Sequence, residues 1–188
     1  MSRLFSFILC DMTGKKIAIR TATETDNVLL AELGRRTFFD TFAKDNTPEN
    51  TAAYLAASFS PEIQAGKLAD AATIFLIAEI DGAPAGYAQL KLGARLPEIS
   101  GERTIEIERI YSEHAWIGHG VGAALMSACI ELAAQKCCDT IWLGVWDQNP
   151  RAIAFYTKWG FKMTGSHVFM LGSEVQNDYL MQRNVKLD

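Results

Sequence analysis

Between Thr104 and Val145 the chain runs through a strand pattern, a glycine-rich loop, a long helix pattern and a second strand pattern. Apolar and polar residues alternate strictly over Thr104–Tyr111, as they do in a half-buried strand. Gly120–Lys136 is an alanine-rich segment of helical length, and Thr140–Val145 has the composition of a buried strand. A helix between two such strands is typical of a β-α-β unit, whose strands lie parallel. The sequence therefore predicts at least one parallel strand pair.

The segments on either side of this unit predict antiparallel hairpins and short helices. Asp81-Gly82 suits a two-residue turn between two strand patterns, Thr73–Ile80 and Ala85–Leu92. Further strands are expected at Lys16–Arg20, Phe161–Phe169 and Asp178–Val185. Helices are expected at Asn27–Phe42, Pro48–Phe59, Pro61–Ala69 and Pro150–Trp159, the last three opening on proline after an N-cap residue. These patterns predict a mixed α/β (α+β) fold.

Length, charge and cysteine usage narrow the class of protein. The 188 residues suit one domain, which we expect at residues 16–188 behind an N-terminal extension at residues 1–15. With 18 Lys and Arg against 22 Asp and Glu, the net charge of -4 argues against a nucleic-acid partner. The same charge is compatible with a cationic substrate. No uncharged stretch is long enough to span a bilayer, and the apolar N-terminal run lacks a small-residue cleavage site. We therefore expect a cytoplasmic protein without a membrane partner and, since the four cysteines lack C-x-x-C spacing, without a metal.

The richest chemical signal is the loop from Ile117 to Ala123, which reads I-G-H-G-V-G-A. Its glycines let the backbone approach an anion, and the following helix adds the partial positive charge of its N-terminus, so a phosphate or pyrophosphate is expected. The alternative is a glycine-rich turn that merely leads into the helix. A P-loop is excluded because no Lys-Ser/Thr follows the glycines. A dinucleotide fingerprint fits Gly118, Gly120 and Ala123, but the segment from Tyr111 to Gly118 is too long for its tight turn.

A second signal lies in the segment that follows Trp142. If a helix begins at Pro150, Asn149 is its N-cap and Tyr156 projects from one face of the helix. The alternative is an aromatic helix that packs into the core. Core packing explains Phe155 and Trp159 but leaves Asn149 and the Tyr156 hydroxyl without a role.

With both segments in place, the chain resembles the GCN5-related N-acetyltransferases (GNAT). The family's Gln/Arg-x-x-Gly-x-Gly/Ala loop corresponds to Ile117-x-x-Gly120-x-Gly122. Its later Asn, helical Tyr and Gly-Phe correspond to Asn149, Tyr156 and Gly160-Phe161, and Ile110-Tyr111-Ser112 fits its strand-to-loop pattern. Two residues depart from the family: Ile117 replaces Gln or Arg, and Ser112 stands where an apolar residue is commoner. The resemblance implies a mostly antiparallel central sheet flanked by helices, and acetyl-CoA as co-substrate.

Within the superfamily the chain is most similar to the spermidine/spermine acetyltransferases of the PaiA type. The segments that carry this similarity are Thr37-Phe38, Thr41-Phe42, Thr47–Asn50, Glu108–Tyr111, His167–Gly172 and Gln176–Asp178. The similarity implies a small-molecule amine acceptor, a polyamine such as spermidine or spermine, and allows a homodimer. Two other functions stay open: the same chemistry on another amine, including a protein N-terminus, or a non-catalytic CoA-binding regulatory module.

The resemblance also implies which residues form the cofactor site. The backbone of Ile110, Tyr111 and Ser112 would bind the pantetheine. The pyrophosphate would lie against the loop formed by Ile117, Gly118, His119, Gly120, Val121 and Gly122. Asn149, Tyr156 and Lys158 would make further contacts.

Acetyl transfer from a thioester to an amine needs a base and an acid, because a primary amine has a pKa of about 10.4 and a thiolate must leave. By resemblance the base is Glu106, acting directly or through water, with Glu108 as its rival; both could instead form a polar strand face that attracts a cation. Tyr156 is the expected acid, because a phenol pKa near about 10 suits a thiolate leaving group. The transfer is expected to be direct, without a covalent enzyme intermediate. Phe38, Phe42 and Tyr54 are the expected apolar walls of the acceptor site, with core packing as the alternative for Phe38 and Phe42.

Overall fold

The computed structural model describes residues 6–10, 16–171 and 174–186 of the chain. They form one eight-stranded sheet in the order β1-β2-β3-β4-β5-β6-β8-β7. The strands are β1 (Ser6–Cys10), β2 (Lys16–Thr21), β3 (Thr73–Ile80), β4 (Ala83–Leu92), β5 (Thr104–Ser112), β6 (Thr140–Trp146), β7 (Lys162–Leu171) and β8 (Glu174–Asn184). The helices are α1 (Asn27–Phe42), α2 (Pro48–Ser58), α3 (Pro61–Ala69), α4 (Val121–Gln135) and α5 (Pro150–Lys158), with short 3-10 turns at Glu24–Asp26, Ala43–Asp45 and His114–Trp116.

Every pair of neighbouring described strands is antiparallel except β5 and β6, which are parallel and joined through α4. The predicted fold class and the predicted β-α-β unit are therefore confirmed. Within the stretch expected to be an N-terminal extension, Ser6–Cys10 pairs with β2. Residues 1–5 and 11–15 of that stretch, Gly172 of the His167–Gly172 segment, and the last two residues lie outside the described part of the chain.

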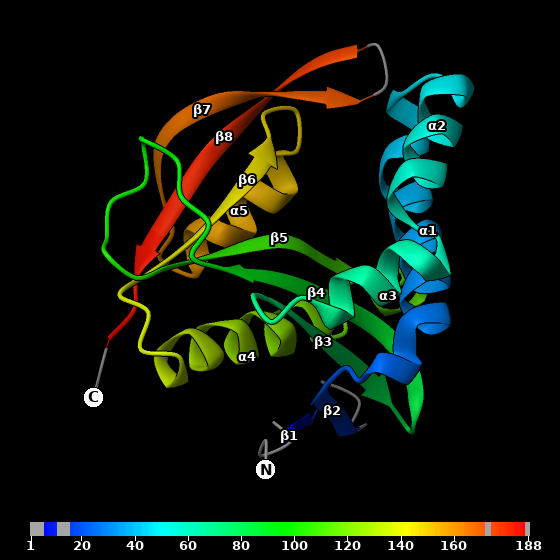
Figure 1. Cartoon of the computed structure of the whole chain (residues 1–188), viewed down its shortest axis with the longest axis horizontal. Helices are drawn as coiled ribbons and strands as arrows, with labels where there is room; N and C mark the ends of the chain where they lie inside the picture. The colour runs from blue at the N-terminus through cyan, green and yellow to red at the C-terminus, as the bar shows by residue number, and fades with distance from the viewer. Residues whose placement is uncertain (1–5, 11–15, 172–173, 187–188) are drawn as a thin grey trace.

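Helices cover both faces of the sheet. Helix α4 packs against β2, β3, β4 and β5, whereas α1 and α3 contact β3, β4 and β5 from the other side. In Figure 1 the group α1–α3 stands at the right and α4 runs below the sheet. The larger core cluster lies under α4 and α5, and a second one, with Leu30, Leu33 and Tyr87, lies under α1. The apolar periodicity of Asn27–Phe42 predicts that Val28 lies on the buried stripe of α1, but its side chain is 51% exposed, so this prediction is wrong at that residue.

The local signals in the sequence explain most element boundaries. Thr47 and Ser60 cap α2 and α3, each accepting a hydrogen bond from a backbone N–H at 3.2 Å. Asp81 and Gly82 have φ angles of 51° and 81°, which is the left-handed pair that a two-residue hairpin turn requires. These caps and this turn confirm the predicted helix starts and the hairpin of β3 and β4.

The strict alternation predicted for Thr104–Tyr111 is wrong beyond Ile107. Gln89 of β4 lies opposite Arg109, but the next residue, Leu90, lies opposite Ile107, so Glu108 is an extra residue in β5. Such a β-bulge reverses the side-chain parity that follows it. Ile110 consequently packs into the same core as Ile107, while Tyr111 packs into the core under α1. Glu108 and Arg109 are two polar residues in succession, so the strict alternation of apolar and polar residues already ends there in the sequence.

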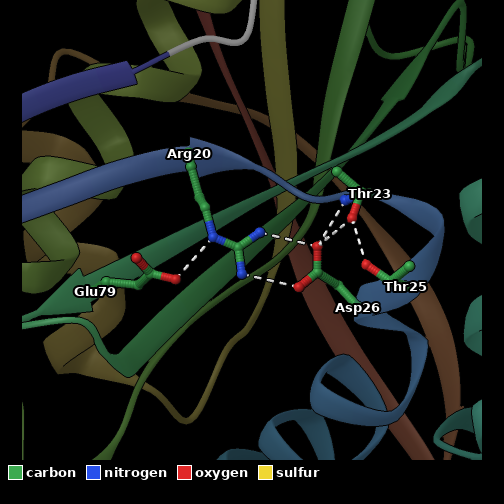
Figure 2. Close-up of polar contacts among 5 residues, drawn as sticks. All are labelled: Arg20, Thr23, Thr25, Asp26 and Glu79. Carbon is green, nitrogen blue, oxygen red and sulfur yellow. Dashed lines mark hydrogen bonds and ion pairs between the residues drawn. The ribbon is translucent and has the colours of Figure 1, made fainter.

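An ion-pair network fixes the start of α1 to the sheet. Figure 2 shows Arg20 of β2 between two carboxylates: it donates to both oxygens of Asp26, at 2.8 and 2.9 Å, and to Glu79 of β3 at 2.7 Å. Asp26 also accepts from the backbone N–H and the hydroxyl of Thr23. Its side chain is only 11% exposed, and these donors, Arg20 first, lower the pKa of Asp26 from 3.8 to about 2.

We expect Asp26→Asn to lower the free energy of unfolding by about 2 kcal/mol at pH 7. The reason is that the folded state stabilises the ionised carboxylate of Asp26 through donors that the unfolded chain does not offer. Because the folded pKa is depressed, this contribution is present above about pH 4 and fades as the pH falls toward 2. Urea unfolding at pH 7 and at pH 2.5 measures it, with the exposed Asp40→Asn on α1 as control. An equal loss of stability at both pH values would contradict the ion-pair account.

Candidate active site

The two parallel strands at the middle of the sheet separate after a short ladder. They pair at only three positions, Thr104–Glu106 of β5 with Thr140–Trp142 of β6, although β5 continues to Ser112 and β6 to Trp146. Figure 1 shows the two strands diverging from that point. The backbone N–H and C=O groups of β5 that face β6 beyond Glu106 therefore have no ladder partner there. An extended ligand can hydrogen-bond to this strand edge as a further strand would.

The glycine loop lies beside Ser112, at the C-terminal end of β5. Gly118 and Gly120 have φ angles of 86° and 90°, so both positions require the left-handed backbone that glycine adopts at no steric cost. Gly120 is the N-cap of α4 and has no side chain to cap it, and the first bond inside the helix runs from the Ala124 N–H to the Gly120 carbonyl at 2.9 Å. The N–H groups of Val121, Gly122 and Ala123 precede that bond and have no partner within the helix. A Cβ at Gly122 would lie 3.7 Å from the Ser112 hydroxyl, so these donors are beside the end of β5.

The loop's other predicted residues contribute differently. The N–H of Ile117 bonds to the His114 carbonyl and that of His119 to the Trp116 carbonyl, so both donors are used within the loop. The side chains of Ile117 and His119 are exposed. An anion would therefore be held chiefly by the first turn of α4, where the helix dipole also favours it.

Helix α5 brings Phe155 to the glycine loop and buries the phenol of Tyr156 in the core under α4. Asn149 caps the helix by accepting from the Ala152 N–H at 3.1 Å, which confirms the predicted N-cap. Tyr156 is 9% exposed, and Phe155 packs 3.8 Å from the position of a Cβ on Gly122. Burial raises the pKa of Tyr156, so its hydroxyl stays protonated. Lys158 is exposed and lies two residues on, about 200° around the helix from Tyr156, so the two side chains point to different sides.

Glu106 lies at the point where β5 and β6 part. It is half-buried, and its neighbours Ile105 and Ile107 point into the core under α4, which directs Glu106 to the opposite face. Burial and then the nearby charge of Glu108 raise its pKa from 4.5 to about 7, while Arg109 acts against them. A carboxyl group with this pKa can take up a proton near neutral pH. Glu108 is exposed, and its carboxylate accepts a hydrogen bond from Gln89.

Aromatic side chains of α1 and α2 stand over this face. Phe42 lies between Tyr111 and Trp146, with ring centroids 6.3 Å from each. Phe38, by contrast, is 3% exposed and belongs to the core between α1 and α2. Tyr54 accepts a hydrogen bond from Arg109 at 3.0 Å. Of the three predicted walls, Phe42 therefore stands nearest the diverging strands, and Trp146 is a wall that the sequence patterns did not indicate.

Three polar residues of this face were missed in the sequence. Gln89 is 1% exposed, Arg109 and Lys67 are half-buried, and all three are joined by hydrogen bonds. Two signals could have revealed them: a glutamine inside the apolar run of β4, and the adjacent charged pair Glu108-Arg109 inside a strand.

Comparison with known proteins identifies the architecture. Residues 36–161 match the acetyltransferase (GNAT) family. The chain belongs to the GNAT family of acetyltransferases. It is 34% identical over 172 residues, 92% of the chain and 98% of the relative, to an uncharacterized N-acetyltransferase from Lactobacillus delbrueckii subsp. lactis. It is 35% identical over 161 residues, 86% of the chain and 99% of the relative, to an uncharacterized N-acetyltransferase from Mycobacterium tuberculosis.

Two solved structures share the fold of this GNAT protein. The PaiA N-acetyltransferase from Thermoplasma acidophilum in complex with coenzyme A superposes with a TM-score of 0.73 at 23% identity, covering 89% of this chain and 98% of that one. The ribosomal-protein-S18-alanine N-acetyltransferase from Escherichia coli has a TM-score of 0.67 at 16% identity, covering 92% and 96%. At these identities the likeness establishes the fold.

As a GNAT protein, the chain is an acetyl-CoA-dependent N-acetyltransferase, and acetyl-CoA is its co-substrate. The strand edge beyond Glu106 and the free donors of α4 suit an extended, anionic co-substrate of this kind. Among the described residues no helix is long and apolar enough to cross a membrane, and no three His, Cys, Asp or Glu side chains are grouped as metal ligands.

We expect Gly120→Asp to weaken acetyl-CoA binding about tenfold or more, because it brings a carboxylate to the end of α4 where a phosphate would bind. Gly120→Asn separates charge from strain, since asparagine tolerates a positive φ and is neutral. Isothermal titration with acetyl-CoA measures both, with Gly66→Asp on the exposed side of α3 as control. Equal affinities for the Asp and Asn variants would refute an anion site at this helix end.

Proposed function

We propose that this enzyme transfers the acetyl group directly from acetyl-CoA to a primary amine, and that its acceptor is a polyamine such as spermidine or spermine. The observation that carries the proposal is the position of Glu106: a half-buried carboxyl group with a pKa of about 7 lies where β5 and β6 separate, at the start of the open strand edge that leads to the glycine loop. In one place the sheet thus offers a strand edge for the acyl donor and a proton acceptor for the amine.

The co-substrate would be held mainly by backbone groups. Ile110, Tyr111 and Ser112 would bind the pantetheine along the open edge of β5, and an N–H near Ile110 or Tyr111 would face the thioester oxygen as its charge grows. The first turn of α4, with the loop that precedes it, would hold the pyrophosphate. Asn149 would contribute through its free amide hydrogens, since its oxygen caps α5, and Lys158 through its exposed ammonium.

Glu106 would act as the base. An amine with a pKa of about 10.4 arrives protonated and must lose that proton before its nitrogen can attack the thioester carbon. The carboxylate of Glu106, directly or through water, would accept it; the new bond is N–C and the bond that breaks is C–S. The nitrogen loses a second proton as the amide forms, and that proton replaces the one that the departing thiolate takes up. Glu108 is a poorer base, because it is exposed and already accepts a hydrogen bond from Gln89.

Tyr156 would act as the acid that protonates the departing thiolate. Its buried hydroxyl stays protonated near neutral pH and is therefore available as a donor. Burial also makes it a weaker acid than a free phenol, so the proton would move only as the thiolate gains its charge in the same dry surroundings, which raise the basicity of the thiolate too. Tyr156 packs in the core under α4, together with Cys129 of that helix.

The polyamine acceptor is supported by carboxylates on the same face of the sheet. Glu106 and Glu108 lie on the β5 side, and Asp178 faces His167 over Gly144 on the β6 side. Phe42 and Trp146 offer aromatic surface to the methylenes and ammonium groups of a polyamine. The coenzyme A complex of a PaiA protein is among the structures with this fold, which agrees with the proposal.

We expect Tyr156→Phe to lower kcat about 100-fold while acetyl-CoA affinity changes little, because only the acidic hydroxyl is removed. Steady-state kinetics together with a thermal-shift titration by acetyl-CoA separate the two effects. Tyr179→Phe, a half-buried tyrosine of β8 in the same core, is the matched control. Unchanged turnover of Tyr156→Phe across the pH range would remove the hydroxyl from the mechanism.

The acceptor is tested by following CoA release with a thiol reagent over a panel of spermidine, spermine, amino acids, aminoglycosides and peptides with free N-termini. The proposal predicts saturable turnover with spermidine or spermine at the highest kcat/KM. Higher kcat/KM with any other amine would contradict the polyamine assignment and keep the reaction class. No turnover with any amine, despite acetyl-CoA binding, would instead indicate a non-catalytic CoA-binding module.

A further inference from the structure

A buried glutamine joins the charged residues around Glu106. Gln89 of β4 is 1% exposed, and both ends of its amide are used. Its carbonyl oxygen accepts from Arg109 at 2.8 Å and from the Lys67 ammonium at 3.2 Å, while its amide nitrogen donates to the carboxylate of Glu108. Two cations on the oxygen and one anion on the nitrogen leave the amide a single orientation. Gln89 thereby fixes the places of three charges at once.

The β-bulge explains why one residue of β4 can reach two successive residues of β5. Gln89 stands at the step where the register shifts, opposite Arg109 and next to the extra residue Glu108. In a regular ladder Glu108 and Arg109 would point to opposite faces. The bulge lets both side chains meet the Gln89 amide.

The two residues held by Gln89 act on Glu106 with opposite sign. The negative charge of Glu108 favours the protonated form of Glu106, and the positive charge of Arg109 favours the carboxylate. None of the ion pairs within 4.0 Å among the described residues involves Arg109, so its charge is not cancelled by a direct carboxylate partner. Its guanidinium instead donates to Tyr54 and lies 5.0 Å from the centre of the Phe59 ring.

The other charged groups near this face have less influence on the protonation of Glu106. Lys91 lies opposite Glu106 in the β4–β5 ladder, but its ammonium is paired with Asp70. Lys67 of α3 has a pKa lowered to about 8 by burial and by the charge of Arg109. Glu108 and Arg109 are the two charges that bear on Glu106 itself.

We propose that Gln89 is a positioning residue for acetyl transfer: it holds Glu108 and Arg109 in fixed places beside Glu106, so that two opposed charges set how readily Glu106 takes a proton. The proposal rests on Glu106 being the base. Without the glutamine, Glu108 would lose its donor and both cations their acceptor, and Glu108 would pair directly with Arg109 or Lys67. Its influence on Glu106 would then be largely cancelled.

The test titrates Glu106 directly, by the carboxyl carbon NMR signal of glutamate-labelled protein, with Glu106→Gln used to assign the signal. In the wild-type background Glu108→Gln should lower the titration midpoint by about one pH unit, and Arg109→Met should raise it by a similar amount. In a Gln89→Leu background the shift caused by Glu108→Gln should fall to less than half. Gln64→Leu is the matched control, because Gln64 is 2% exposed and donates to Ser58 instead. Circular dichroism verifies that each variant is folded.

An undiminished Glu108→Gln shift in the Gln89→Leu background would overturn the proposal, as would equal shifts in the Gln64→Leu and Gln89→Leu backgrounds. The pH profile of kcat/KM separates this failure from a failure of the proposed function. Its acid limb should follow the Glu106 midpoint in every variant. An acid limb that stays in place while the NMR midpoint moves would show that Glu106 is not the base. Gln89 would then have no positioning role in acetyl transfer.

Discussion

The active site depends on the short parallel ladder between β5 and β6. Parallel strands need a crossover helix, and α4 provides it, which brings the N-terminus of that helix to the end of β5. Because only three residue pairs hold the strands together, the rest of β5 has an open edge in the middle of an otherwise continuous sheet. A backbone edge and a helix N-terminus thus meet at one place. Few side chains are needed to bind a long anionic co-substrate there, which is consistent with the replacement of the family's loop Gln or Arg by Ile117.

The β-bulge at Glu108 determines which face of the sheet the later residues of β5 reach. Before the bulge, Ile105 and Ile107 face the core under α4 and Glu106 faces the other way. After it, Arg109 and Tyr111 reach the α1 side, where Arg109 contacts α2 through Tyr54. The irregularity therefore brings Arg109 and Tyr111 to the face on which the proposed base already lies, and anchors the helices that cover this face. Polar groups are tolerated at this depth because Gln89 satisfies them.

Much of this arrangement could be predicted from the sequence, because its signals are local. The Asp81-Gly82 turn, the capped prolines and the glycine loop each specify a backbone conformation by residue type alone. The bulge could not be predicted, because it depends on the register between β4 and β5. The exposure of Val28 and the meeting of Gln89, Arg109 and Lys67 were missed for the same reason: they follow from packing between segments far apart in the chain. The roles given to Glu106 and Tyr156 remain proposals that the geometry supports.

A crystal structure of the enzyme with coenzyme A would test the central claim most directly. The account predicts pantetheine hydrogen-bonded along Ile110–Ser112 between the separated strands, and the pyrophosphate against the N–H groups that open α4. It also predicts that β5 and β6 keep their three-pair ladder when the ligand is bound. Coenzyme A bound elsewhere on the sheet, or a ladder that extends beyond Glu106 and Trp142 in the complex, would contradict it.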